Sequence, residues 1–510
     1  MTATSVHGIA SFEDLVDLAS EKIGGAALAC SDDFFASMDH LVKSKEARFD
    51  EDSYGDRGKI MDGWESKRSH RENHGGASGD WHEDWCVIRL GAPGIIRGVV
   101  VDTAFFKGNF PSHAALEATA VDGYPSANDV ATRSEWIPIV PKIALQGNAK
   151  NPFAVSSSYR FTHVRLRIFP DGGVARLRVY GEPSPDWRIH GGLDGELEVS
   201  GAELGGVVVA CSDMFFGSRH NLLFPGHSGG MHDGWETRRA RREGFDWAVI
   251  KLGAKGIPSR LVVDTSHFKG NCPESFTVDG AMSADGEWAE IFPRTLLRPH
   301  TRHVFSMKSA AGHKISHARL RIYPDGGVAR FRLFAHLDDD ERAALRVRRI
   351  NAMPPMEAEA AFASCCGSHT WVKKMLAARP FLSSRALDEA LRTAFASLVN
   401  DDWLEAFRVH PRIGGHGTEG PATATSQSWS KDEQRGVSAA DEDVRMRLAA
   451  ENDAYFERHG FIFIVMATGK TASEMLAILE QRGQNDRDTE IKNAAAEQKK
   501  ITELRLRKLC

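Results

Sequence analysis

Two copies of one motif decide the fold: HVRLRIFPDGGVAR at residues 163–176 and HARLRIYPDGGVAR at residues 317–330. In the first half of each copy, apolar and basic residues alternate, as in a β-strand with one buried face. The Pro-Asp-Gly-Gly that follows is typical of a turn, because proline fixes φ and glycine tolerates positive φ. The apolar pattern restarts with Val174, Leu177 and Val179, so the stretch is predicted to form a β-hairpin.

The repetition extends over the first two thirds of the chain. Matches that keep one order along the chain indicate duplication of a structural unit. Runs of β-branched residues bounded by Gly or Pro, at 95–101 and 261–263, predict that each unit is an antiparallel, jelly-roll-like β-sandwich. Short helices are expected to be minor, and residues 11–22 are one candidate. Four further motifs occur twice: ACSD at 29–32 and 210–213, DGWE at 62–65 and 233–236, VDT at 101–103 and 263–265, and FKGN at 106–109 and 268–271.

The composition is that of an ordinary globular protein. A length of 510 residues predicts roughly three domains of about 150 residues each. The net charge of −5 is spread along the chain, which argues against nucleic acid as a partner, because phosphate binding needs clustered Lys and Arg.

The cysteines and the apolar runs indicate the compartment. The seven cysteines include no CxxC pair, which argues against a disulfide framework or a zinc site and favours a reducing compartment. Residues 1–10 do not resemble a signal peptide, and no apolar run is long enough to span a membrane. We therefore expect a cytoplasmic protein without a membrane partner.

The duplicated motifs resemble the allantoicase family over residues 11–335. As a set, in this order and in two copies, they are highly specific. The resemblance implies two galactose-binding-like β-sandwiches in tandem that hydrolyse allantoate to ureidoglycolate and urea. A divalent metal such as Mn is sometimes implicated in this family; no single spacing in the sequence demands a metal site, and the metal ligands are unknown.

Allantoate carries a carboxylate and two ureido groups on one carbon, and the repeated polar residues suit that chemistry. The carboxylates can transfer protons, the cations can bind the substrate carboxylate, and the amides can hold a ureido group. Which copy keeps the chemistry is open, because His267 in the second copy stands where Phe105 stands in the first. The candidates are Glu65, Glu236, Asp62 and Asp233 as carboxylates, Arg68, Arg239, Lys107 and Lys269 as cations, Asn109 and Asn271 as amides, and His267.

Structural roles compete with these assignments. Trp64 and Trp235 more often cap a sandwich core than line a pocket. Asp171 and Asp325 are most simply residues of the Pro-Asp-Gly-Gly turns. For Asp-Gly-Trp-Glu-x-x-Arg, a structural salt bridge is as good a reading as catalysis.

The last third of the chain has a different character. Ala-, Leu- and Arg-rich stretches with a spacing of three to four residues predict an all-α helical bundle. Gly460 is expected to end one helix, and Thr471 or Ser473 to begin another. The expected helices cover residues 357–363, 385–399, 442–458, 472–482 and 488–509.

Motifs in this part resemble OHCU decarboxylase (OHCU is 2-oxo-4-hydroxy-4-carboxy-5-ureidoimidazoline) from residue 352 to 510. The motifs are HTWV at 369–372 with RPF at 379–381, HPRIG at 410–414, SxxEQ at 430–434, GFxFI at 460–464 and KIxxLRL at 500–506. The resemblance implies decarboxylation of OHCU to (S)-allantoin. It places the catalytic groups at His410, Glu433 and Arg505, with Pro411, Ser430 and Gln434 binding substrate beside them.

The chemistry fits this assignment without a cofactor, because the imine and carbonyl of the substrate ring can accept the electrons that decarboxylation releases. His410 is expected to donate or relay the proton, since an ordinary imidazole pKa lies near the working pH. Ser430 and Glu433 also match a helix capping box, and both roles can hold at once. Arg505 is expected to orient a carboxylate or carbonyl of the substrate.

The expected organisation is therefore four segments: a first sandwich at 1–185, a second at 186–337, a linker at 338–351 and an all-α domain at 352–510. The leading hypothesis is a bifunctional enzyme whose partners are the small molecules allantoate and OHCU, with a homo-oligomer left open. One alternative is that the sandwiches form a non-catalytic ligand-binding module and only the helical part is an enzyme. Another is a scaffold in which both parts drive oligomerisation.

Overall fold

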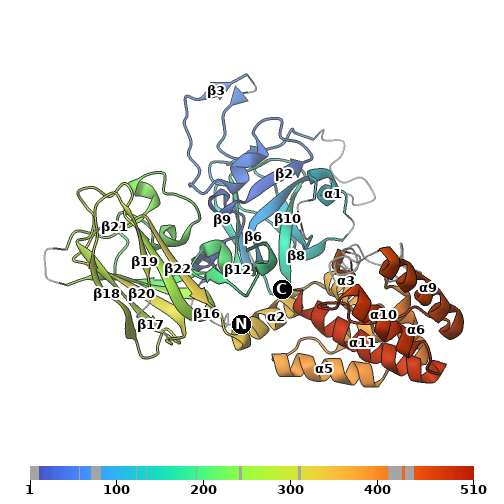
Figure 1. Cartoon of the computed structure of the whole chain (residues 1–510). Helices are drawn as coiled ribbons and strands as arrows, with labels where there is room; N and C mark the ends of the chain where they lie inside the picture. Colours follow the sequence, from blue (N-terminus) through green and yellow to red (C-terminus); the bar gives the residue numbers. More distant parts are fainter. Residues whose placement is uncertain are drawn as a thin grey trace. The chain divides into compact units, whose positions relative to one another are not determined.

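The structure is a computed structural model (Figure 1) that describes residues 11–56, 58–69, 82–121, 123, 125–133, 135–190, 192–240, 244–307, 312–411, 428–430 and 442–509. The chain divides into two compact units, Met1–Arg342 and Ala343–Cys510. The first unit contains the two repeats, and the second is helical.

The first repeat is an antiparallel β-sandwich built around one long strand, β6 (Asp84–Asp102). The first half of β6 pairs with β2 and β10, and its second half pairs with β9 and β12, so this one strand contributes to both layers. The other main strands are β1 (Val16–Asp17), β2 (Ala26–Cys30), β7 (His113–Thr119), β8 (Ile137–Ala144), β9 (Lys150–Ala154), β10 (Arg160–Phe169) and β12 (Arg176–Pro183).

The second repeat has the same topology around β16 (Asp246–Asp264). The strand order β22-β16-β20-β17-β18 matches β12-β6-β10-β7-β8 of the first repeat. The prediction of two jelly-roll-like sandwiches in tandem is confirmed. The other strands are β13 (Glu196–Glu198), β14 (Val207–Cys211), β17 (Ser275–Ala281), β18 (Ala289–Leu296), β19 (Arg302–Ser306), β20 (Ile315–Tyr323) and β22 (Arg330–His336).

The predicted hairpin around Pro-Asp-Gly-Gly is wrong. Strands β10 and β12 pair with different halves of β6 rather than with each other. The turn between them carries the chain from one layer to the other, with Gly172 at φ 132°. The short β11 (Gly173–Val174) within this crossing pairs with β5 (Trp64–Glu65), and β21 (Gly327–Val328) pairs with β15 (Trp235–Glu236) in the second repeat.

The predicted helix at residues 11–22 is also wrong. This stretch forms two 3-10 turns, η1 (Phe12–Asp14) and η2 (Glu21–Ile23), on either side of strand β1. The side chains of Ser11 and Ser20 accept backbone hydrogen bonds at the start of each turn. Local capping and the pairing of β1 with β12 therefore outweigh helix propensity here.

The second unit is an all-α bundle, as predicted. The expected linker lies mostly in helix α2 (Asp339–Ala352). Gly460 follows α9 in the left-handed region, with φ 74°, and Thr471 caps α10 through a capping box with Glu474. The other helices are α3 (Pro355–Cys365), α4 (His369–Ala377), α5 (Ser384–Ala396), α6 (Asn400–Arg408), α9 (Glu442–His459), α10 (Ala472–Arg482) and α11 (Arg487–Arg507), of which α4 and α6 were not among the expected helices.

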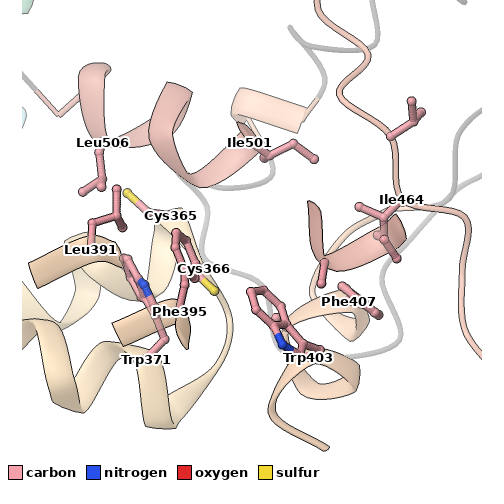
Figure 2. Close-up of a cluster of buried hydrophobic side chains, with 14 of the residues drawn as sticks. Cys365, Cys366, Trp371, Leu391, Phe395, Trp403, Phe407, Ile464, Ile501 and Leu506 are labelled. Carbon is pink, nitrogen blue, oxygen red and sulfur yellow. The ribbon is translucent and has the colours of Figure 1, made fainter. Parts of the chain in front are cut away.

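The core of the helical unit contains stacked aromatic rings among aliphatic side chains (Figure 2). Trp371, Phe395 and Trp403 form a stack with ring centroids 5.9 and 5.7 Å apart. Cys365 and Cys366 are buried beside them, and burial raises the pKa of the Cys366 thiol to about 11, so it packs as a small apolar side chain. Among the helices that the structure describes, none is long and apolar enough to cross a membrane.

Candidate active sites

The repeated motifs of each sandwich meet around one buried phenylalanine. A Cβ on Gly173 would lie 1.9 Å from the ring of Phe106, and a Cβ on Gly63 would lie 2.7 Å from it. In the second repeat, Gly327 and Gly234 approach Phe268 in the same way. The glycines of Pro-Asp-Gly-Gly and Asp-Gly-Trp-Glu are therefore required for this close packing, which brings three motifs together.

The tryptophans of Asp-Gly-Trp-Glu belong to the core. Trp64 and Trp235 are fully buried, and each indole N–H donates to a backbone carbonyl, of Asp32 and Asp213 respectively, at 2.8 Å. This anchoring fixes the backbone at the next residue, Glu65 or Glu236.

The aspartates of this motif serve the fold. Asp62 pairs with the buried Arg176 at 2.8 Å, and Asp233 pairs with Arg330 at the same distance. Both arginines also donate to backbone carbonyls of the motif segment. The expected structural salt bridge therefore exists, but its cation comes from the strand after Pro-Asp-Gly-Gly.

A Glu–Asn pair occurs in both repeats. Asn109 Nδ2 donates to Glu65 Oε1 at 2.8 Å, and Asn271 Nδ2 donates to Glu236 Oε1 at 2.5 Å. Glu65 is only 8% exposed. Burial raises the pKa of Glu65, although the hydrogen bond from Asn109 opposes the shift.

Glu65 and Asn109 line a cavity of about 340 Å³ in the first repeat. Lys107 also lines it, so the structure brings three of the predicted residues together. Phe105 stacks on Phe49, with centroids 5.5 Å apart. Phe105 was noted only as the counterpart of His267, and Phe49 lies outside the repeated motifs, so neither was predicted to line a site. The full lining is Phe35, Phe49, Lys59, Met61, Glu65, Phe105, Lys107, Gly108 and Asn109.

The other predicted cations lie differently. Arg68 Nη1 is 3.1 Å from Asp171 Oδ1, and Asp171 also accepts from the backbone and hydroxyl of Ser69. Asp171 is therefore a long-range acceptor that holds the segment after Glu65, rather than a local turn residue. Arg239 and Lys269 are exposed side chains of the second repeat.

His267 is held by the backbone. The ring Nε2 of His267 lies 2.9 Å from the backbone carbonyl of Ser228. The backbone N–H of His267 donates to His300 Nδ1 at 2.8 Å. Both His267 and Phe105 have φ near +70°, at 72° and 68°, so the two copies share this unusual backbone conformation.

The part of the chain that the structure describes shows no assembled set of metal ligands. Among the described residues, no three His, Cys, Asp or Glu side chains gather as a metal site requires. Glu236 accepts a hydrogen bond from Asn271, and the His267 ring is hydrogen-bonded to the carbonyl of Ser228. Metal dependence of the sandwich unit thus stays a prediction.

In the helical unit, His410, Pro411 and Ser430 line a second cavity, of about 30 Å³ among the described residues. Arg505, which is 1% exposed, donates from Nη2 to Ser430 Oγ at 2.9 Å. Four of the predicted residues are thus neighbours. Glu433 and Gln434 lie outside the described residues.

The environment of His410 contradicts the expected pKa near the working pH. Burial and the nearby Arg505 guanidinium lower the pKa of His410 to about 3, and Gln498 acts in the opposite direction. His410 is therefore a neutral imidazole at neutral pH. It can accept a proton, but it does not begin as an acid.

The sequence motifs assigned no site role to Gln498 or to the stretch 463–468. This stretch forms one wall of the cavity with Ile501 and Leu504. The stretch 461–465 is a run of buried apolar residues without helical periodicity. That pattern was the available signal for a buried wall.

Comparison with known proteins agrees with both predicted family resemblances. The allantoicase repeat model matches residues 16–184 and 197–338. The chain belongs to the allantoicase family. The OHCU decarboxylase model matches residues 351–507, so the chain also carries a domain of a second enzyme family.

Relatives and solved structures are similar to each part. A probable allantoicase from Nocardia farcinica is 44% identical, over 66% of this chain and 99% of its own length. The allantoicase structure from Saccharomyces cerevisiae is 34% identical and covers 63% of this chain and 92% of that chain, with a TM-score of 0.54. An OHCU decarboxylase solved in the presence of (S)-allantoin is 37% identical over 29% of this chain and 96% of its own, with a TM-score of 0.25.

Proposed function

We propose that this chain catalyses two reactions of ureide breakdown. The sandwich unit hydrolyses allantoate to ureidoglycolate and urea, and the helical unit decarboxylates OHCU to (S)-allantoin. The observation that carries the proposal is that residues of each motif set line a cavity of their own. Glu65, Lys107 and Asn109 meet at one, and His410 and Ser430 at the other.

In allantoate hydrolysis, the C–N bond to one ureido group breaks and the departing urea nitrogen takes a proton. Water then adds its oxygen to the same carbon and loses a proton. Glu65 can first donate the proton to the urea nitrogen, because burial favours its protonated form, and the resulting carboxylate can then accept the proton from water. Lys107 would bind the substrate carboxylate, and the free amide oxygen of Asn109 would accept from a ureido N–H.

We assign this chemistry to the first repeat. Glu65 is more buried than Glu236, and the described cavity lies beside Glu65. The second repeat keeps the Glu–Asn pair but holds His267 by a backbone carbonyl.

In OHCU decarboxylation, the bond to the carboxylate breaks, CO2 leaves, and the electron pair moves into the ring toward the imine nitrogen, which takes a proton from solvent. A proton is then delivered to the ring from one face. His410, as a neutral imidazole, would accept the proton of the substrate hydroxyl and relay it. Arg505 would orient a carboxylate or carbonyl, both directly and by fixing Ser430.

Urea release from allantoate by the full chain tests the sandwich activity and separates it from the alternative of a ligand-binding module. Absence of urea, with Mn²⁺ supplied, would favour the module. The same assay with a chelator, followed by Mn²⁺, measures metal dependence. The decarboxylase activity is tested by the rate of OHCU decay above the spontaneous rate.

A further inference from the structure

A buried segment without regular structure forms the wall of the helical-unit cavity. Residues 461–465 and Ala467 are buried, yet the stretch 462–467 belongs to no helix or strand. Buried backbone N–H and C=O groups need hydrogen-bond partners. The partners of this segment therefore have to come from elsewhere.

Side chains supply several of them. Arg482 Nη1 donates to the carbonyl of Ile464 at 2.8 Å. Glu497 accepts from the N–H of Met466 at 2.8 Å, and Lys470 Nζ donates to the carbonyl of Met466 at 2.7 Å. Figure 2 shows Ile464 beside the core helices. The path of the segment is therefore set by three charged residues, Arg482, Glu497 and Lys470, that follow it in the sequence.

Arg482 is itself held by a buried network. Its Nε and Nη2 both lie 3.0 Å from Glu490 Oε2, and Glu490 has no exposed surface. Tyr455 donates to Glu490 at 2.5 Å, and the amides of Asn485 and Asn493 each donate at 2.7 Å.

The charges of the network are consistent with this role. Burial alone would raise the pKa of Glu490, but four hydrogen bonds lower it below its ordinary value, so the carboxylate stays charged. The pKa of the Tyr455 phenol is raised, which keeps it a donor. Arg482 also lies over the ring of Phe463, 4.8 Å from its centroid.

We propose that Arg482, oriented by Glu490, is a positioning residue of the decarboxylase site. By fixing the carbonyl of Ile464, it fixes the cavity wall that faces His410. The inference rests on the proposed decarboxylase function. It adds that the placement of substrate against this wall, and hence the face that receives the proton, depends on a side chain that does not line the cavity.

The experiment uses the full chain with OHCU generated in the assay, and measures kcat, KM and the enantiomeric excess of allantoin. Uncatalysed decay protonates both faces, so loss of positioning lowers the excess. The double variant R482M/E490Q removes both charges together, which avoids an unpaired buried charge. The glutamine introduced at position 490 keeps an oxygen that can accept from Asn485 and Asn493, and its amide N–H can donate to the Tyr455 hydroxyl. We expect kcat to fall about 10- to 100-fold with a much smaller change in KM, and the excess to fall.

Two further variants complete the test. R482K keeps the positive charge but loses the planar fork that reaches both Ile464 and Glu490, so we expect it not to restore the excess. R447M is the matched control, because Arg447 forms an exposed pair with Glu480 between α9 and α10. It should behave as the unmodified chain.

Two results would overturn the inference. One is full kcat and full enantiomeric excess in a folded R482M/E490Q. The other is a loss of activity only in proportion to the unfolded fraction, with the excess unchanged, since that describes a merely structural network. If the unmodified chain itself does not accelerate OHCU decay, the proposed function fails instead, so the two failures are distinguishable.

Discussion

At the scale of single residues, the same pair of side chains marks both repeats: Asn109 with Glu65, and Asn271 with Glu236. The environments differ. Glu65 is buried and lines a cavity that Lys107 also lines, whereas Glu236 is half-buried. Duplication has therefore preserved the hydrogen bond, while the two carboxylates differ in burial, and burial raises the pKa of Glu65.

Replacing Glu65 with Gln tests this difference. The variant E65Q keeps the size and hydrogen-bonding capacity but cannot transfer a proton, so kcat for urea release should fall by about 100-fold or more. E236Q is the matched variant of the other copy. A larger loss in E236Q than in E65Q would contradict the assignment of the chemistry to the first repeat.

His410 predicts a pH dependence of stability. Its pKa is about 3 in the folded chain, against an ordinary value of 6.5, so the unfolded chain binds more protons between these values. The folded state therefore loses stability as the pH falls below 6.5, by about 2 kcal/mol between pH 7 and pH 5. Denaturant unfolding at the two pH values measures this loss.

The variant H410N supplies the control for this measurement, because it cannot titrate. The part of the pH dependence assigned to His410 should be absent from it. An equal loss of stability in both proteins would show that other groups cause the effect.

At the scale of elements, the repeated motifs predicted the two sandwiches, and helical periodicity predicted five of the helices. The pairing of strands was beyond the sequence. Strands β10 and β12 are joined by a tight turn, but each pairs with a different half of β6. Local turn chemistry does not distinguish a hairpin from a crossing between layers. Helices α4 and α6, at nine residues each, are too short to give a clear periodic signal.

The site was predictable in part for a related reason. Motif resemblance brought His410, Ser430 and Arg505 together, and the structure places them at or beside one cavity. The pKa of His410 was not predictable, because it depends on burial by residues distant in sequence. The cavity wall at 463–468 was not assigned, although its apolar run at 461–465 is visible in the sequence.

The contact between the two repeats also belongs to this scale. Lys22 of η2 pairs with Asp233 at 2.7 Å and lies 4.8 Å from the centroid of Phe224. Phe224 occupies the place that Lys43 has in the first repeat, where Lys43 lies near Asp62 at 3.8 Å. A cation from one repeat thus completes the salt bridge of the other.

The variant K22M keeps the aliphatic stem but removes this cation. We expect the free energy of unfolding of the sandwich unit to fall by about 1 kcal/mol, since Asp233 keeps Arg330. Denaturant unfolding measures the change, with K43M as the control at the longer and more exposed pair. An effect of K22M no larger than that of K43M would show that the inter-repeat pair adds nothing.

At the scale of the whole molecule, the chain joins parts from two enzyme families with different folds, one all-β and one all-α. The sandwich unit and the helical unit each have their own core and their own cavity. The two proposed reactions use different substrates and different residues. A substitution at one site should therefore leave the other reaction intact.

The most direct test measures both reactions on the same preparations of full-length E65Q and H410N. The account predicts that E65Q loses urea release from allantoate but keeps OHCU decarboxylation, and that H410N shows the reverse. Loss of both reactions in either folded variant, or of neither in both variants, would contradict two independent active sites in one chain.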